Sequence, residues 1–288
     1  MKSMVYLPLI VFSQLASGWH LPKQSMMAGN QLQQESQWFQ EDYDFGGIVS
    51  LSNCSGSLVR FDDSRDNDLA LVLTNGHCVK MMEPGTVFYD RTTTRKISFL
   101  DASGKTIGRA FTRKLLYATM TDTDMALYVL GKTYEQILES FGINALTISR
   151  ERPMPGDEIH IISGYWKTGF SCEVEATIHQ LKEARWVFRD SIRYSRPGCE
   201  VYGGTSGSPV ILAGTKTVIA VNNTGNESGR RCTMNNPCEV DESGKMTYQK
   251  GYSYGQQIFW LYDCRNEDKE TFEFDFDRTG CRLPKPTT

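Results

Sequence analysis

The stretch Gly203-Gly204-Thr205-Ser206-Gly207-Ser208-Pro209-Val210 surrounds one serine with small residues. Flanking glycines allow the backbone to bend sharply, which would expose the Ser206 hydroxyl and leave amide hydrogens pointing at whatever that hydroxyl attacks. The apolar run 210–212 that follows is typical of a buried strand. Glycine–serine turns are also common as purely structural features, so a nucleophilic Ser206 requires a base and an acid elsewhere in the chain.

Two other segments supply a candidate base and a candidate acid. A serine hydroxyl becomes an effective nucleophile when an imidazole takes its proton, and a buried carboxylate fixes the imidazole tautomer. His77 lies in Thr74-Asn75-Gly76-His77-Cys78, directly after an apolar run. Asp124 precedes the apolar segment Met125-Ala126-Leu127-Tyr128, and Asp122 is the alternative carboxylate. Taken singly, each could be a packed or turn residue, but their order along the chain is that of a known triad.

These segments resemble the motifs of the chymotrypsin-like (trypsin-like) serine peptidases. That family places its histidine in Thr-Ala-Ala-His-Cys, its aspartate in Asp-Ile-Ala-Leu and its serine in Gly-Asp-Ser-Gly-Gly-Pro. A fourth segment, Asn53-Cys54-Ser55-Gly56-Ser57-Leu58, is similar to the family's Cys-Gly-Gly-Ser-Leu. The resemblance extends from about Gly47 to Leu261 and is closest in character to the bacterial trypsin-like and glutamyl endopeptidase members.

The resemblance implies a serine endopeptidase that acts on protein or peptide substrates through an acyl-enzyme, without metal or organic cofactor. His77 would be the general base and then the general acid, Asp124 its orienting partner and Ser206 the nucleophile. The amides of Gly204 and Ser206 would form the oxyanion hole. The alternative is a binding protein on the same fold that has lost activity, and the intact triad argues against it.

One position departs from the family pattern. Activatable members carry an aspartate just before the serine, and it pairs with the new N-terminal amine after propeptide cleavage. This chain has Thr205 there, and a neutral threonine cannot form that ion pair. We therefore expect the site to form without that switch, as in bacterial relatives such as the glutamyl endopeptidases, which also favour Ser-Gly-Ser-Pro.

Substrate preference is open at this stage. Glu200 lies six positions before Ser206, where trypsin-like relatives hold the acid of the primary pocket, and a carboxylate there would select arginine or lysine. A surface Glu200 paired with Arg196 is the alternative. By the same resemblance, Asn222 and Asn223 would lie on the strand that lines the cleft and pairs with substrate backbone.

Charge and hydropathy limit the partners and the compartment. The formal net charge is -3 and the basic residues are dispersed, so we expect no nucleic-acid binding. The apolar run from Met4 to about Leu15, followed by Ala16-Ser17-Gly18, indicates a signal peptide cleaved near Gly18. No other segment is long and apolar enough to span a membrane. We therefore expect a soluble protein, secreted or periplasmic, that acts as a monomer.

Eight cysteines in an exported chain favour disulfides. Zinc is the alternative, but no Cys-x-x-Cys occurs and the four histidines are scattered. The family resemblance implies a bridge between Cys54 and Cys78. For the remaining cysteines we expect pairing in sequence order, as Cys172 with Cys199, Cys232 with Cys238 and Cys264 with Cys281.

From Gly47 onward, short β-rich runs alternate with glycine and polar turns, which indicates an all-β fold. The resemblance implies two antiparallel six-stranded β-barrels with the triad in the cleft between them. The helical spacing of 134–141 predicts one helix, and 256–262 is the best candidate for a C-terminal helix. An arm over 19–45 would be a propeptide, a strap anchored by Trp38 and Phe39, or a disordered tail. The expected organisation is therefore a signal peptide (1–18), the arm (19–45), a first barrel (46–135), a connection (136–154), a second barrel with the C-terminal helix (155–262) and a tail (263–288).

Overall fold

The structure is a computed structural model that describes residues 43–266 and 272–286. The predicted signal peptide and all but the last three residues of the predicted arm, Trp38 and Phe39 included, lie outside the described residues. Within the described part of the chain, no helix has the length and apolar character needed to cross a membrane.

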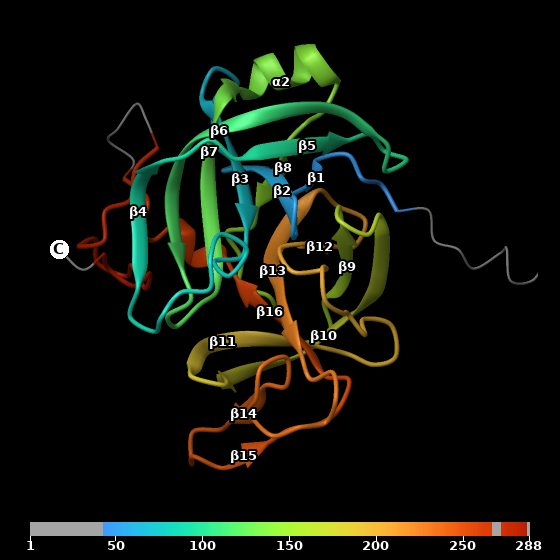
Figure 1. Cartoon of the computed structure of the whole chain (residues 1–288), viewed down its shortest axis with the longest axis vertical. Helices are drawn as coiled ribbons and strands as arrows, with labels where there is room; N and C mark the ends of the chain where they lie inside the picture. The colour runs from blue at the N-terminus through green and yellow to red at the C-terminus, as the bar shows by residue number, and fades with distance from the viewer. Residues whose placement is uncertain (1–42, 267–271, 287–288) are drawn as a thin grey trace, which may run out of the picture. The chain divides into compact units, whose positions relative to one another are not determined.

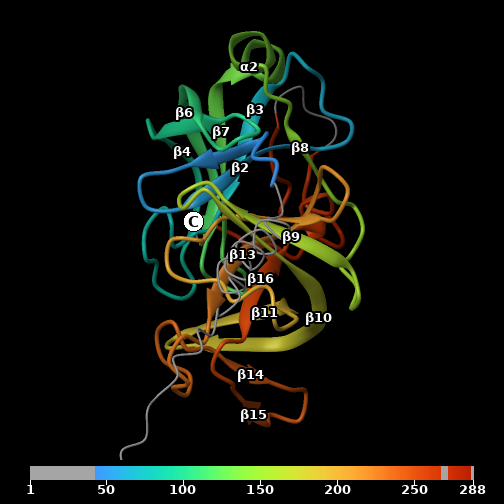
Figure 2. The same ribbon diagram turned by 90° about the vertical axis from the view of Figure 1, so that its right-hand side faces the viewer.

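The first half of the described chain forms a closed barrel (Figures 1 and 2). Its strands follow the order β1-β5-β6-β7-β3-β2, and pairing of β1 with β2 closes the ring. All these pairings are antiparallel, and an additional strand, β4 (Val87–Thr92), pairs with β6. The six strands of the ring are β1 (Ile48–Ser50), β2 (Ser55–Arg60), β3 (Leu69–Thr74), β5 (Lys96–Leu100), β6 (Thr106–Thr119) and β7 (Met125–Thr133).

The second half forms a second closed barrel of the same kind. Its order is β13-β12-β9-β10-β11-β16, and pairing of β13 with β16 closes it. A small extension, β14 (Cys238–Val240) and β15 (Met246–Thr247), continues from β10. The prediction of an all-β protein with two six-stranded antiparallel barrels is confirmed. The six strands are β9 (Glu158–Ser163), β10 (Thr168–Glu183), β11 (Trp186–Tyr194), β12 (Pro209–Leu212), β13 (Thr217–Gly225) and β16 (Ser253–Gln257).

A helix and a short strand connect the two barrels. The predicted helix is present as α2 (Tyr134–Phe141). Thr133 and Gln136 form a capping box at its start, and Gly142 ends it with φ 68°, a left-handed conformation that glycine adopts without strain. The next strand, β8 (Leu146–Ile148), pairs in parallel with both β2 and β13. This strand therefore joins the two barrels into one continuous sheet, which the sequence did not indicate.

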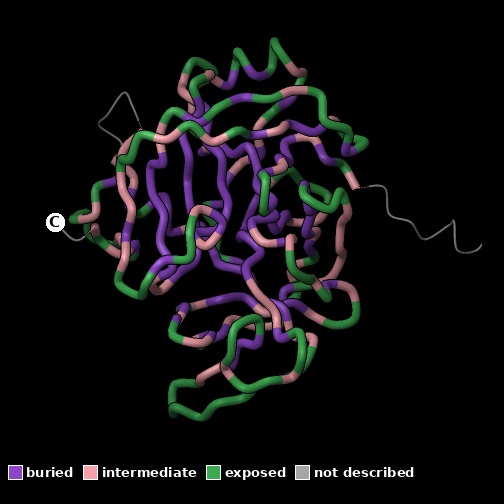
Figure 3. Tube along the Cα trace, viewed as in Figure 1, coloured by how far each residue is buried: buried purple, intermediate pink, exposed green. Residues whose placement is uncertain are grey.

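The interiors of the barrels are apolar. β3 reads Leu-Ala-Leu-Val-Leu-Thr, and five of its six residues are buried because it lies in the middle of the first ring. Figure 3 shows the buried segments running along the strands, whereas the loops between them are exposed. Burial of β3 from Ala70 to Thr74 fixes the backbone from which the loop carrying His77 departs.

The predicted C-terminal helix over 256–262 is wrong. Gln256 and Gln257 belong to β16 and pair with Val221 and Ala220 of β13. Only one 3₁₀ turn follows, η1 (Phe259–Leu261). The reason is burial: most side chains of 256–262 are inside the protein, so the segment has no polar face with which an amphipathic helix could meet water.

The described part of the predicted tail packs on the first barrel. Phe272 stacks on Phe61 with ring centroids 4.9 Å apart, and Phe274 lies 5.6 Å from the Tyr117 ring. The disulfide between Cys264 and Cys281 closes this segment. These residues therefore contribute to the core of the first barrel.

Candidate active site

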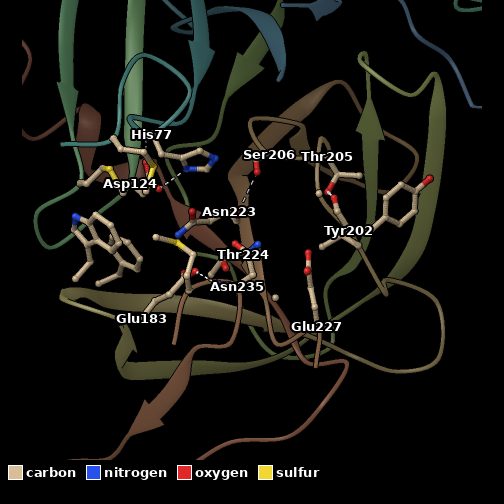
Figure 4. A pocket seen from close by; sticks show the side chains of 18 residues that line it. His77, Asp124, Glu183, Tyr202, Thr205, Ser206, Asn223, Thr224, Glu227 and Asn235 are labelled. Atoms are coloured by element: carbon tan, nitrogen blue, oxygen red, sulfur yellow. Dashed lines mark hydrogen bonds and ion pairs between the residues drawn. The ribbon is translucent and has the colours of Figure 1, made fainter. Parts of the chain in front are cut away.

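His77 and Asp124 meet because their strands are neighbours. β3 and β7 pair antiparallel, with Thr74 opposite Ala126, so the end of β3 lies beside the start of β7. The His77 Nδ1 and Asp124 Oδ2 atoms are 2.7 Å apart, and the His77 backbone amide donates to Asp124 Oδ1 at 3.0 Å (Figure 4). Asp124 is only 1% exposed. A buried carboxylate thus fixes both the ring and the backbone of His77.

The loop that carries His77 is tightly constrained. A Cβ atom at Gly76 would lie 2.0 Å from the carbonyl oxygen of Thr119, so only glycine fits there. Asn75 donates its side-chain amide to the Asp124 carbonyl oxygen at 2.8 Å. A disulfide joins Cys78 to Cys54 on the neighbouring loop. These contacts leave His77 little freedom relative to Asp124.

Opposing effects act on the pKa of His77. Burial disfavours the charged ring and lowers the pKa, but the Asp124 carboxylate favours it through its charge and its hydrogen bond, and the nearby Glu183 adds to that effect. The net result raises the pKa of His77 above its ordinary value of 6.5. The alternative carboxylate, Asp122, instead forms an exposed ion pair with Arg189, 3.0 Å between Oδ1 and Nε.

Ser206 lies in a turn between β11 and β12. Gly204 and Gly207 flank the turn with φ angles of 92° and 81°, which only glycine adopts readily. The Ser206 hydroxyl donates to the carbonyl oxygen of Asn223 at 3.3 Å, and among the described residues no hydrogen bond joins it to His77. Both side chains nevertheless line one pocket (Figure 4). Catalytic hydrogen bonds often tighten only when substrate binds.

The predicted oxyanion-hole amides are available. Thr205 donates its amide to the Tyr202 carbonyl oxygen at 3.1 Å, whereas the amides of Gly204 and Ser206 donate to no other group in the described part of the chain. Two free amides beside a serine hydroxyl can stabilise negative charge on a substrate oxygen.

The pocket between the barrels carries negative charge. Its lining includes the carboxylates of Asp124, Glu183 and Glu227, and none of the described residues that line it is a lysine or arginine. Glu227 is exposed and makes no ion pair among the described residues. Such a lining produces a negative potential in the pocket. Neither Glu183 nor Glu227 was expected in the site from the sequence.

Glu183 reaches the pocket at the tip of the β10–β11 hairpin. That tip contacts the first barrel, where Trp186 Nε1 donates to the Met82 carbonyl oxygen at 2.8 Å. Glu183 is 6% exposed and accepts a hydrogen bond from the Asn235 amide at 2.6 Å. Burial raises the pKa of this carboxyl above its ordinary value of 4.5. The position of Glu183 depends on tertiary packing of a long hairpin, for which the sequence carries no short motif.

Glu200 does not line the pocket. Its carboxylate lies 3.7 Å from Nε of Arg196 and accepts the Gly198 amide at 3.0 Å, on an exposed part of the turn. The surface pairing with Arg196, which the sequence left as the alternative, is therefore the observed arrangement. Of the three carboxylates that line the pocket, only that of Glu227 is exposed.

Asn222 and Asn223 face opposite sides of β13. Asn223 lines the pocket, and its buried Nδ2 has no hydrogen-bond partner. Asn222 is buried behind the turn and donates to Thr205, so it contacts the catalytic loop and does not line the pocket. The expectation that Asn222 binds substrate is corrected accordingly, because neighbouring side chains alternate across a strand.

The four expected disulfides are present: Cys54–Cys78, Cys172–Cys199, Cys232–Cys238 and Cys264–Cys281. Ligand atoms of Cys54, His77 and Cys78 cluster within 4.8 Å. Both sulfurs of this cluster are bonded to each other, so neither is a free thiolate that could coordinate zinc.

Comparison with known proteins gives a family match and several remote structural matches. A family model described as a trypsin-like peptidase domain matches residues 54–221, more than half of the chain. No curated protein matches the sequence significantly. Three similar solved structures have low identity and TM-scores below 0.5. They are the apo MamO protease domain from Magnetospirillum magneticum (13% identity, 76% of this chain and 95% of that chain, TM-score 0.45), a Glu endopeptidase in complex with MPD (17%, 76% and 90%, 0.44), and the thermostable serine protease AL20 from an extremophilic microorganism (18%, 75% and 92%, 0.42).

Proposed function

Because the chain belongs to the trypsin-like peptidase domain family and has its chymotrypsin-like pair of barrels, we propose that it is a secreted serine endopeptidase. The observation that carries this proposal is the buried Asp124 carboxylate, bonded to both the ring and the backbone of His77 across the pocket from Ser206. A histidine held in this way is prepared to accept a proton from a serine.

In the proposed reaction, the Ser206 hydroxyl oxygen attacks the carbonyl carbon of the scissile peptide while its proton passes to Nε2 of His77. The amides of Gly204 and Ser206 donate to the resulting oxyanion. His77 then returns the proton to the leaving amine, which departs and leaves an acyl group on Ser206. Water attacks this ester, again with His77 as the base, and the acid product is released with the hydroxyl regenerated.

Asp124 supports each proton transfer. When His77 accepts a proton, the imidazolium is stabilised by the adjacent carboxylate, which is the same effect that raises the pKa of His77. Only the neutral ring can act as the base, so the activity should rise as the pH passes upward through that raised pKa.

The proposed enzyme is exported and acts on proteins or peptides. Disulfides persist in oxidising compartments, and the four present in the described part of the chain fit secretion or a periplasmic location. The substrates would be proteins or peptides, cut by a monomer. A carboxylate-lined pocket favours a cationic side chain next to the scissile bond.

An inactive binding protein on the same fold is the second candidate. The observation in its favour is that the Ser206 hydroxyl donates to Asn223 and not to His77. An inactive protein would keep this arrangement in the presence of substrate, whereas an enzyme would change it.

Labelling with a fluorophosphonate separates the two candidates. The reagent should modify the unaltered protein at one site, which peptide mapping assigns to Ser206, and Ser206→Ala should abolish the label. Ser103→Ala, in an exposed loop of the first barrel, is the matched control and should be labelled at the same rate. A folded protein that resists labelling over a range of pH would refute the enzymatic function.

A further inference from the structure

The turn that carries the catalytic serine contacts a buried side chain on one face and an exposed aromatic ring on the other. We propose that Asn222 and Trp166 are positioning residues that hold the turn 202–206 in its catalytic conformation without an ion pair at Thr205. The structural part of this proposal is independent of activity, and its catalytic consequence rests on the proposed function.

On the inner face of the turn, a network of hydrogen bonds connects Tyr194 and Asn222 to Thr205 and Tyr202. The Tyr194 hydroxyl donates to Asn222 Oδ1 at 3.2 Å. Asn222 Nδ2 donates to the Thr205 carbonyl oxygen at 3.0 Å and lies 3.1 Å from Thr205 Oγ1. The Thr205 hydroxyl in turn donates to the Tyr202 carbonyl oxygen at 2.6 Å. The two ends of the turn are thereby tied to β13 behind it.

In this hydrogen-bond network, each hydroxyl donor has an acceptor. The Tyr194 and Thr205 hydroxyls each donate once, and the Thr205 carbonyl oxygen also accepts the Ser208 hydroxyl at 2.6 Å. Asn222 and Thr205 are each 1% exposed, and hydrogen bonds away from water are costly to lose. A network in which every group has a partner fixes one arrangement of the turn.

On the outer face, the loop between β9 and β10 covers the turn. Trp166 Nε1 donates to the Gly203 carbonyl oxygen at 2.8 Å. A Cβ atom at Gly204 would lie 2.5 Å from Trp166 Nε1 and 3.1 Å from the Tyr165 ring, so the aromatic side chains lie directly against the backbone of Gly204. The amide of Gly204 is therefore held between this ring and the network around Thr205.

All groups that hold the turn are neutral. Among the described residues, the hydrogen-bond partners of Thr205 are carbonyl, amide and hydroxyl groups, and burial raises the pKa of Tyr194 well above its ordinary value of 10. The aspartate that activatable relatives use at this position needs a charged amine to pair with, whereas Asn222 reaches Thr205 as part of the folded barrel. Ordering of the oxyanion hole would then follow from folding, with no requirement for a new N-terminus.

The test compares two variants with a matched control in the full secreted chain. Thr205→Val keeps the shape of the side chain but loses the hydroxyl that bonds Tyr202 and Asn222. Trp166→Phe keeps a ring on the surface but loses the indole donor to Gly203. Tyr134→Phe is the control: it removes one buried hydrogen bond, 2.7 Å to the Val59 carbonyl oxygen, at the start of α2 in the connection between the barrels.

Two measurements are made on each protein: amide hydrogen exchange of the peptide that spans 202–206, and kcat and KM on a peptide reporter. Loss of the Thr205 hydroxyl should speed exchange in the turn and lower kcat, each by about tenfold or more, while KM changes less than about threefold. Trp166→Phe should act in the same direction by a smaller factor. Tyr134→Phe should leave exchange in the turn and kcat unchanged.

The outcomes separate this inference from the proposed function. Unaltered exchange in the turn of both variants overturns the inference, whatever the activity. Faster exchange in a protein that no fluorophosphonate labels upholds the positioning role and refutes the peptidase function. A turn that exchanges rapidly in the uncut chain and becomes protected only after proteolytic trimming also overturns the inference. Because Trp166 is half exposed, its variant should fold even if Thr205→Val does not.

Discussion

The two halves of the site hold the proposed catalytic groups by different means. In the first barrel, His77 is fixed by a buried charge, since Asp124 bonds its ring and its backbone at 2.7 and 3.0 Å. In the second barrel, Ser206 lies in a turn that neutral hydrogen bonds to Thr205 hold in place, with no ion pair at Thr205 among the described residues. The position of His77 therefore depends on a charge, and that of Ser206 depends on the hydrogen-bonded conformation of its turn.

This difference predicts different kinetic effects of substitution. A change in the charge around His77 alters its pKa, so it should move the pH profile as well as the rate. A change in the support of Ser206 alters the position of the oxyanion-hole amides, so it should lower kcat at every pH. The Thr205 and Trp166 variants described above test the support of Ser206. Substitutions of Asp124, Glu227 and Glu183, in order of decreasing expected effect, test the charges of the site, and each has a matched control.

Removal of the Asp124 charge should have the largest effect. Asp124→Asn keeps the shape but loses the carboxylate that fixes the His77 tautomer, and kcat should fall by about 10⁴-fold. The pKa of His77 should also fall, because the carboxylate that raises it is gone. Stopped-flow acylation and NMR titration of the imidazole measure these two effects.

Asp122→Asn is the matched control for that substitution. Asp122 is two residues away and pairs with Arg189 at the surface, so kcat should change by less than about threefold. An equal loss in both variants would mean that the histidine is supported by the wider charge distribution and not by one bonded carboxylate.

The sequence identified the residues that meet in the candidate site better than it predicted their surroundings. His77, Asp124 and Ser206 each lie in a short motif next to an apolar strand, and local motifs are readable without tertiary contacts. The sequence of strand β6 does not by itself predict a strand, because charged residues such as Arg109 and Arg113 and several shifts of register interrupt its alternation. The helix expected over 256–262 was wrong because pairing with β13 overrides helical spacing.

The roles of neighbouring polar residues were the least predictable part of the site. Asn222 and Asn223 look equivalent in the sequence, yet one supports the turn and the other lines the pocket, since which face of β13 is buried depends on register. Glu200 has the expected spacing from Ser206, but the turn directs it toward Arg196. Spacing along a chain therefore identifies a site more reliably than it identifies specificity.

The substrate specificity of the second half can be tested by removing the charge of Glu227. Arginyl reporter peptides should be cut faster than glutamyl or phenylalanyl ones, because carboxylates and no lysine or arginine line the pocket. Glu227→Gln should lower the preference for arginine over phenylalanine by about fivefold, a modest factor because Glu227 is exposed. Glu200→Gln is the matched control and should change it less than twofold. A preference for glutamyl peptides would contradict this account of the pocket.

Glu183 belongs to one half of the site and affects a residue of the other. It belongs to β10 of the second barrel, yet its charge contributes to the raised pKa of His77 in the first. Burial raises the pKa of Glu183 itself, so its influence on His77 exists only at a pH above that value. A neutral residue of the same shape would remove the charge and keep an oxygen to accept the Asn235 amide.

Glu183→Gln should therefore produce a small shift with a definite sign. A negative charge near His77 favours the protonated ring, so its removal lowers the pKa of His77 and enlarges the fraction of neutral base at acidic pH. The acid limb of kcat/KM should move to lower pH by about half a unit, with the plateau rate nearly unchanged. Glu158→Gln, an exposed residue at the start of β9, should leave the limb in place. If Glu183→Gln instead lowers the plateau without moving the limb, Glu183 acts through the geometry of the hairpin, and the electrostatic control of His77 is confined to the first barrel.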